Sequence, residues 1–178
     1  MKVPSEQSGR ERGAVLVVSL FLLVVLTLLG VTSMQGTTME TRIANNREDR
    51  ATAFMAAEAA LREGEQAVQA LTSAPTPVDA TCAANCVVWA PGALFSDYAD
   101  YDDPAVWADA RIPVANDPLV GVAAPPSYAI ELVSVDPAGG SLLVGSTGRM
   151  YYFQVTARGT GASSAAHVVL QSNVVKFF

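Results

Sequence analysis

The sequence has few of the side chains from which catalytic and metal sites are usually built. Its 178 residues include one histidine, His167, and two cysteines, Cys82 and Cys86. His167 lies in a strand-like AAHVVL segment, and no Ser, Cys or carboxylate motif accompanies it, so no general base with a nucleophile is indicated. The glycines of GSTG and GTGAS lack the sequence context of a phosphate-binding loop. We therefore predict that the protein is not an enzyme and uses no cofactor or catalytic metal.

Positive charge is also scarce. The chain has 11 Lys and Arg against 17 Asp and Glu, a formal net charge of −6. Residues 1–13 hold three of the positive and two of the negative charges, so residues 14–178 carry −7. Proteins that bind nucleic acid need a basic patch to contact phosphates. The charge balance predicts no nucleic-acid partner.

Charge is absent altogether from residues 14–39, AVLVVSLFLLVVLTLLGVTSMQGTTM. A helix that crosses a hydrocarbon core of ~30 Å needs about 20 mainly apolar residues, and this run supplies them. The small excess of positive charge ahead of the run keeps the N-terminus in the cytoplasm and sends the rest of the chain across. The sequence thus predicts a protein that spans the membrane once.

Three interpretations of this N-terminus stay open on the residues alone. A secretory signal has an apolar core of about 7 to 15 residues and a small-x-small cleavage site, whereas this run is longer. A permanent anchor keeps residues 1–13. In the third interpretation a peptidase on the cytoplasmic side cuts between Gly13 and Ala14, which leaves the apolar helix at the new N-terminus.

Four segments carry a resemblance to a known family. They are Arg12-Gly13-Ala14, LLVVLTLLGVTSMQ at residues 22–35, TTMETRIANNREDRATAFMAAEAALREGE at residues 37–65 and, more weakly, YYFQVTARGTGASSAAHVVLQS at residues 151–172. In these segments the chain resembles the PilX family of type IV pilus minor pilins. Residues 72–148 show no such resemblance.

The resemblance implies a prepilin leader at residues 1–13, cleavage after Gly13 by the prepilin peptidase and N-methylation of Ala14. It implies a location in the inner membrane, with the head in the periplasm, and in the pilus. The implied partners are other minor pilins and the major pilin, and a large tip adhesin is a further candidate. The associated processes are pilus assembly, cell adhesion and twitching motility.

One position departs from the pattern of this family. Most pilins have glutamate as the fifth mature residue, and this chain has Val18. An isolated charge in an apolar bundle costs several kcal/mol unless it is paired, so a subunit without the carboxylate cannot neutralise a neighbour's N-terminal ammonium. We hypothesise a position at or near the pilus tip. The alternative is a protein with a single span that never leaves the bilayer.

Residues 40–71 have the pattern of an amphipathic helix that continues the apolar one, with no proline before Pro75. The face expected to pack against the head is marked by Phe54, Ala57, Leu61 and Val68. Between the two helical halves, residues 30–38 contain two glycines and several β-branched or hydroxyl side chains. Such residues are poor helix formers, so they predict a bend or local melting there.

Residues 72–178 are enough for one small globular head. Alternating apolar residues predict strands at residues 128–132, 151–158 and 166–170, with a return at 141–144. The closing apolar residues 174–178 are either a further strand or an exposed docking surface. The expected fold is α+β and pilin-like, with the long N-terminal helix packed on an antiparallel sheet of about four strands. The expected divisions are residues 1–13, 14–39, 40–71 and 72–178.

Residues 72–103 are expected to be irregular, and they contain both cysteines. Three residues separate Cys82 from Cys86, a poor spacing for zinc, and a location outside the cytoplasm favours a local disulfide. The acidic stretch SDYADYDDP at residues 96–104 offers carboxylates at residues 97–103, but it lacks the frame of a calcium loop. A solvated loop is the preferred interpretation, and calcium stays open. Its aromatic residues Tyr98, Tyr101 and Trp107 either contact a partner or fold back onto the head.

Two functions of different classes are compatible with these observations. The favoured one is a minor pilin that belongs to a tip or initiation complex, primes pilus assembly and presents an adhesin. The other is a membrane-anchored interaction or adaptor protein of the pilus or secretion apparatus that is not incorporated in the fibre. N-terminal processing distinguishes them, because only the first requires the chain to begin at Ala14.

Overall fold

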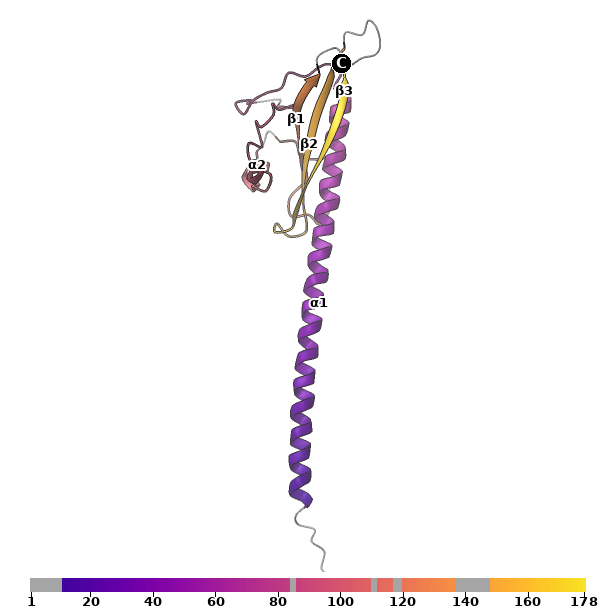
Figure 1. Ribbon diagram of the computed structural model, residues 1–178, viewed down its shortest axis with the longest axis vertical. Coiled ribbons are helices and arrows are strands. Elements are labelled where there is room, and N and C mark those ends of the chain that lie inside the picture. The colour runs from indigo at the N-terminus through magenta and orange to yellow at the C-terminus, as the bar shows by residue number, and fades with distance from the viewer. Residues whose placement is uncertain (1–10, 84–85, 110–111, 117–119, 137–147) are drawn as a thin grey trace, which may run out of the picture. The chain divides into compact units, whose positions relative to one another are not determined.

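The computed structural model of the protein describes residues 11–83, 86–109, 112–116, 120–136 and 148–178. Figure 1 shows the elements in this part of the chain. They are the helix α1 (Glu11–Ala70), the short 3-10 helix η1 (Tyr98–Tyr101), the helix α2 (Pro104–Trp107), and the strands β1 (Ser127–Asp136), β2 (Met150–Thr160) and β3 (His167–Phe177). The predicted α+β class, with a long N-terminal helix and an antiparallel sheet, is confirmed.

The chain divides into two compact units. One ends at Asn45, and the other, which we call the head unit, comprises Asn46–Phe178. Helix α1 contributes to both, so its residues 46–70 belong to the same unit as the sheet. The amphipathic end of the helix is therefore part of the head unit. The division into residues 1–13, 14–39, 40–71 and 72–178 stays a prediction.

Helix α1 is continuous through residues 30–38. Two threonines in this stretch bond back to the helix: the Thr32 hydroxyl donates to the Leu29 carbonyl at 2.9 Å, and the Thr38 hydroxyl donates to the Met34 carbonyl at 3.0 Å. Each glycine costs only about 1 kcal/mol in a helix, too little to interrupt one that continues for several turns on both sides. The predicted local melting is therefore wrong for the chain by itself. The bend, and melting in an assembled fibre, stay predictions.

The three described strands form one antiparallel sheet in the order β1-β2-β3. Its register pairs Ile130 with Val155 and Phe153 with Val174, and β1 contains a bulge between Leu132 and Ser134. The closing residues 174–178 do not make a separate strand, because β3 continues without a break to Phe177. The return expected at residues 141–144 lies outside the described residues.

One face of the sheet packs on the helical residues of the head unit and forms the main core. In β2, Phe153, Val155 and Ala157 are fully buried, as their alternation predicts. They contact buried residues of α1 and β1, and the cluster as a whole comprises Ala60, Val68, Val88, Ala115, Tyr128, Ile130, Leu132, Phe153, Val155 and Ala157. This cluster attaches the sheet to α1.

The helix face that meets the sheet is made of small residues. An added Cβ at Gly159 in β2 would lie 2.2 Å from the Ala57 nitrogen and 2.4 Å from the Ala53 carbonyl oxygen. Because the two backbones come so close, only alanine and glycine fit between them. The fully buried residues of α1 are accordingly Ala53, Ala56, Ala57, Ala60 and Val68.

Three of the four predicted face residues agree with this packing, and one does not. Ala57 and Val68 are fully buried, and Leu61 packs partly against the main core. Phe54 is 48% exposed, so its prediction is wrong. Its aromatic ring is too large for a contact in which the sheet lies against the helix backbone.

Irregular chain covers part of the opposite face of the sheet and forms a second, smaller core. Phe95, Trp107 and Ile112 pack there against Ala129 of β1. The backbone of Trp89 makes two hydrogen bonds to β1. Its N–H donates to the Ile130 carbonyl at 2.8 Å, and its carbonyl accepts from the Leu132 N–H at 2.9 Å. The head unit thus has three layers: helix, sheet and irregular segment.

The close approach at Gly159 predicts a sensitive position. We expect Gly159→Ala to lower the free energy of unfolding of the head unit by about 1 to 3 kcal/mol, because the added methyl group forces two backbones apart. Gly36→Ala is the control, since an added Cβ at Gly36 meets nothing within 4 Å. Chemical denaturation of the purified chain measures both, and equal stability of the two variants would contradict the packing argument.

Candidate functional site

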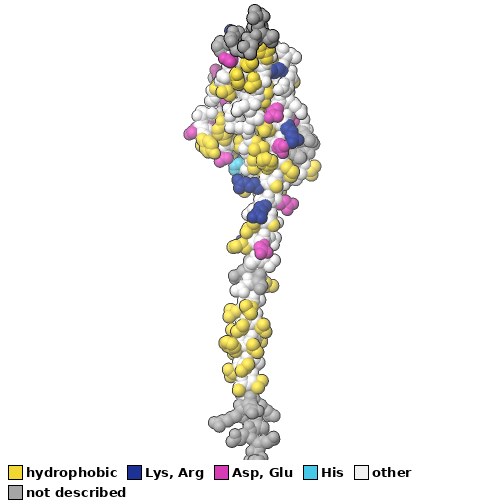
Figure 2. All heavy atoms as spheres, turned by 45° about the vertical axis from the view of Figure 1, so that its right-hand side comes forward, with side chains coloured by type: hydrophobic (Ala, Val, Ile, Leu, Met, Phe, Trp, Pro, Cys, Tyr) yellow, Lys and Arg dark blue, Asp and Glu magenta, His cyan; other side chains and the backbone are white. Residues whose placement is uncertain are grey.

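The apolar part of α1 exposes its side chains on all sides. Across the candidate span the richest window has a mean hydropathy of 3.0, and none of it is buried within the protein. Figure 2 shows hydrophobic side chains gathered along this part of the helix. Their exposed fractions are high, with Leu16 at 67%, Phe21 at 66% and Leu26 at 66%. A helix that is apolar all round needs a surrounding apolar medium, either lipid or other helices.

Two hydroxyl groups within this segment are satisfied inside the helix. The Ser19 hydroxyl donates to the Leu16 carbonyl at 2.9 Å, and the Thr27 hydroxyl donates to the Val24 carbonyl at 2.8 Å. Backbone N–H and C=O groups are paired along the helix by the helical pattern itself. The segment therefore enters an apolar medium without an unpaired hydroxyl at these two positions, which would cost free energy there.

The residues predicted for processing lie at the beginning of this helix. Gly13 and Ala14 are within the first turns of α1, and an added Cβ at Gly13 would meet nothing within 4 Å. Val18 follows one turn later and is 58% exposed. The cleavage, the methylation and the role of Val18 remain predictions, and the geometry leaves all three positions accessible.

The acidic segment of the head unit uses its carboxylates to hold its own backbone. Asp97 caps η1, and the Asp100 carboxylate accepts hydrogen bonds from the backbone N–H groups of Ser96 at 2.7 Å and Asp97 at 2.9 Å. Asp103 caps α2 by accepting from the Ala105 N–H at 2.8 Å. No group of three or more His, Cys, Asp or Glu suited to a metal occurs in the described part of the chain.

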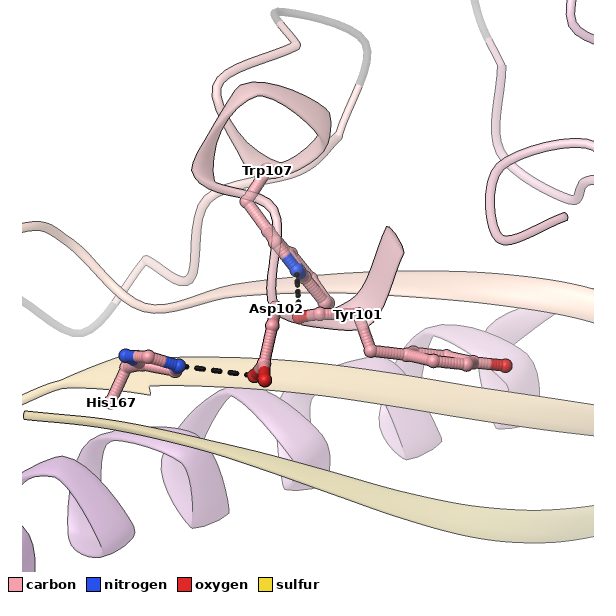
Figure 3. A network of polar contacts seen from close by, with 4 residues as sticks. All are labelled: Tyr101, Asp102, Trp107 and His167. Atoms are coloured by element: carbon pink, nitrogen blue, oxygen red, sulfur yellow. Dashed lines mark hydrogen bonds and ion pairs between the residues drawn. The ribbon is translucent and has the colours of Figure 1, made fainter. Parts of the chain in front are cut away.

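The three aromatic residues of this segment behave differently. Trp107 is 7% exposed and donates its indole N–H to the Tyr101 carbonyl at 2.9 Å, and Tyr101 stacks on Phe95 with 4.6 Å between ring centroids. Figure 3 shows the bond between Trp107 and Tyr101. Trp107 and Tyr101 thus fold back onto the head unit, whereas Tyr98 is 85% exposed.

His167 at the start of β3 faces this segment. Its Nε2 lies 3.1 Å from Oδ1 of Asp102, as Figure 3 shows. The pair lines a recess of about 610 Å³ together with Asn46 and Arg50 of α1 and with Tyr98. The recess offers hydrogen-bond donors and acceptors. Ser163 also lines this recess, and its hydroxyl donates to the Asp49 carboxylate.

The two cysteines form the predicted disulfide. Cys82 and Cys86 are bonded, with 6.1 Å between their Cα atoms. The bond closes a short loop in the segment between α1 and Trp89. On either side of this loop the chain is paired, because the Val78 N–H donates to the Val88 carbonyl at 3.0 Å. Since the closed loop is very short, its effect on stability through chain entropy is small.

Sequence analysis missed the residue that caps α1. Lys176, in β3, donates from Nζ to the carbonyl oxygens of Val68 at 3.1 Å and Leu71 at 2.6 Å, and also to that of Gln69. Val68 and Gln69 lie in the last turn of α1 and Leu71 directly follows it, a place where a positive charge is favourable. The Val68 carbonyl also accepts from the Leu71 N–H at 3.2 Å. A single lysine in an otherwise uncharged strand was the available signal.

Asp49 makes a second connection between distant parts of the chain. The hydroxyl of Ser163 donates to the Asp49 carboxylate, and so does the Ser163 N–H at 3.2 Å. These hydrogen bonds hold the pKa of Asp49 below its ordinary value. They tie the loop between β2 and β3 to α1, and the sequence distance of 114 residues explains why no local pattern predicts them.

Glu131 is a buried carboxyl group in β1. It is 5% exposed, and burial raises its pKa, although hydrogen bonds from the backbone N–H groups of Gly92 and Leu94 act in the opposite direction. Its Oε1 is buried and has no hydrogen-bond partner among the described residues. The side chain therefore anchors the segment at residues 92–94 to the sheet, but its ionised form is poorly solvated.

These features define a pilin-like protein: an apolar helical N-terminus that needs an apolar medium, and an antiparallel sheet packed on the second part of the same helix. Comparison with known families gives two matches. The family described as PilX N-terminal matches residues 12–62, and the family described as type IV pilus assembly protein PilX C-terminal matches residues 43–176. The chain belongs to the PilX family of type IV pilus assembly proteins.

The family match confirms the resemblance and extends it over the middle of the chain, where residues 72–148 had suggested none. Searches of curated proteins and of solved structures found no match. Membership assigns the chain a role as a minor pilin in type IV pilus assembly, in a structural family that interacts with other pilus components. The apolar helix fits the membrane anchoring and the pilus location of such a protein.

The cap formed by Lys176 predicts a loss of stability on substitution. We expect Lys176→Met to lower the free energy of unfolding by about 1.5 to 3 kcal/mol, because the charged hydrogen bonds to the end of α1 are lost. Lys176→Arg, which keeps the charge, should lose less. Denaturant titration checks both variants, and a Lys176→Met protein as stable as the parent would contradict the assignment.

The buried Glu131 predicts a pH-dependent difference. Its pKa is raised in the folded state, so the folded protein binds this proton more tightly than the unfolded chain does, and stability is lost as pH rises through the folded pKa. Glu131→Gln removes this cost. We expect the variant to unfold at a higher temperature than the parent at pH 7, with the difference shrinking below about pH 4.

Calorimetric scans of both proteins from pH 3 to pH 7 measure this difference. A variant that is less stable than the parent at neutral pH would show that the ionised carboxylate is favourable, as a strong acceptor of the two backbone N–H groups. Asp49 and Asp100 have lowered pKa values in the folded protein, so the stability that their ionised forms contribute is lost in acid. This loss is the same in the parent and in the variant and does not affect the difference between them.

Proposed function

We propose that this minor pilin belongs to a complex that primes pilus assembly and stays at or near the tip of the fibre. The observation that carries the proposal is Val18, at the position where most pilins have glutamate. In a fibre of packed apolar helices, the N-terminal ammonium of a subunit needs a carboxylate from its neighbour. Val18 cannot supply one, so this subunit fits a place where no neighbour requires it.

The apolar part of α1 supports the same proposal. Its exposed side chains are compatible with lipid before assembly and with neighbouring helices afterwards, since both media are apolar. Transfer between them loses little hydrophobic free energy, because no apolar surface has to remain in water. A complex of minor pilins whose helices associate in the membrane can therefore begin a fibre.

The head unit is the part available to other proteins. Tyr98 is held outward by a backbone that Asp97 and Asp100 fix through a capping box, a rigid presentation that favours contact with a partner. We propose that the head unit contacts other minor pilins and the major pilin, and that in the tip complex it helps to present an adhesin.

Substitution of Val18 tests the placement at the tip. We expect Val18→Glu to move the protein from the tip into the shaft, because the new carboxylate can pair with the ammonium of a neighbour. Immunogold labelling of sheared pili should then show several-fold more copies along each fibre. Val17→Glu is the matched control, because it puts a carboxylate on the same helix but one residue away, and it should not enter the shaft.

An unchanged location and number of copies for Val18→Glu would mean that this position does not decide placement. Deletion of the protein in cells that cannot retract pili tests the assembly role separately. Loss of surface pili in such cells supports priming, whereas a normal number of pili would contradict it and point to a role in contact.

A further inference from the structure

The two edges of the sheet differ in how they are protected. The outer edge of β1 is covered by irregular chain, through a bridge between Trp89 and Glu131 and another between Val114 and Ser127. The outer edge of β3 has no bridge or backbone hydrogen bond to any described residue. In Figure 1, β3 forms the side of the sheet away from β1. Native proteins usually cover or charge such an edge, because its unpaired groups bind other strands.

The hydrogen bonds at the end of the strand show which residues of β3 have outward backbone groups. Arg149 and Phe178 exchange both bonds, at 2.8 Å and 3.1 Å. In an antiparallel ladder such pairs alternate with pairs that exchange none. Along β3 the backbone N–H and C=O groups of the even-numbered residues therefore point toward β2. The backbone groups of the odd-numbered residues point away from the sheet, and these residues are Val169, Gln171, Asn173, Val175 and Phe177.

The same odd-numbered residues carry exposed apolar side chains near the C-terminal end of the strand. Val175 is 50% exposed and Phe177 is 52% exposed, and Met150, which pairs with Phe177, is 38% exposed. The one charged side chain in this half of β3 is Lys176, which turns to the opposite face and caps α1. Within the described part of the chain, this end of the edge therefore offers both an unpaired ladder and an apolar strip, without a charge to repel a partner strand.

A second copy of this chain fits the edge poorly. In a two-fold symmetric antiparallel pair centred on Asn173, Phe177 faces Val169 and Val175 faces Gln171. If the centre moves to Val175, that residue faces itself, but Phe177 then faces Asn173. A register centred on Lys176 does place Val175 opposite Phe177, but it also places Lys176 directly opposite the Lys176 of the second copy. Like charges directly opposite each other are destabilising, so a strand of different sequence is favoured.

We propose that the edge of β3 from Gln171 to Phe177 binds an extended segment of another pilus component, which adds a fourth strand to the sheet. Main-chain hydrogen bonds to the odd-numbered residues provide affinity, and two apolar side chains of the partner, two residues apart, lie against Val175 and Phe177. This inference rests on the proposed function, because it takes the partner from the pilus machinery.

Site-specific photo-crosslinking in piliated cells tests the proposal. A benzophenone amino acid replaces Val175 in one strain and Phe177 in another, and mass spectrometry identifies the attached residue of the partner. We expect attachment to one protein at two positions about two residues apart, as for paired strands. Attachment to another copy of this chain would overturn the proposal. Attachment at two partner positions that are not about two residues apart would overturn it as well.

Two substitutions in the Phe177 crosslinking strain test the edge itself. Asn173→Pro removes an outward N–H and leaves the bonds to β2 in place, and Val175→Lys adds the charge that commonly protects edges. We expect each to lower the crosslinked yield about tenfold, the effect of roughly 1.4 kcal/mol. Val133→Lys is the matched control, since Val133 is 48% exposed in β1, and it should leave the yield unchanged.

The thermal unfolding of the purified variants shows whether the fold is kept. If both edge variants are folded and crosslink as well as the parent does, the proposal is wrong. Recovery of the unsubstituted protein in sheared pili separates this failure from failure of the proposed function. A chain found in pili but giving no adduct at residues 175 and 177 contradicts only the strand addition, whereas a chain absent from pili contradicts both.

Discussion

The central constraint on this protein is that the first part of α1 has apolar side chains exposed in every direction. Water is an unfavourable medium for such a helix, at a cost of roughly 25 cal/mol for each Å² of apolar surface. Its backbone groups and the hydroxyls of Ser19 and Thr27 are satisfied internally, so a lipid bilayer and a bundle of similar helices are both suitable. One structure can therefore serve before and after assembly.

The head unit depends on a different property of the same helix. Between Ala53 and Gly64 the helix presents small residues to the sheet, and Gly159 brings the β2 backbone against it. Lys176 then binds the C-terminal end of the helix, and Asp49 holds the loop between β2 and β3. These contacts join residues more than 100 positions apart, so the head unit is stabilised mainly by nonlocal interactions along α1.

Periodic patterns predicted the parts of the fold that depend on local sequence. The apolar run, the alternation in β2 and the close spacing of Cys82 and Cys86 each correspond to an element or bond of the structure. Phe54 was misassigned because hydrophobicity does not reveal how closely two backbones approach. Lys176 and Glu131 were missed because their partners are distant in sequence, and the division of β3 failed because two apolar runs of one strand resemble two strands.

The N-terminus of the protein found in pili provides the most direct test of this account. Intact mass spectrometry of the chain from sheared and purified fibres should give a polypeptide that begins at Ala14 and carries one added methyl group. This result would show that the helix leaves the membrane with its leader removed. A chain that keeps residues 1–13 and stays entirely in the membrane fraction would contradict the account and leave an anchored adaptor in its place.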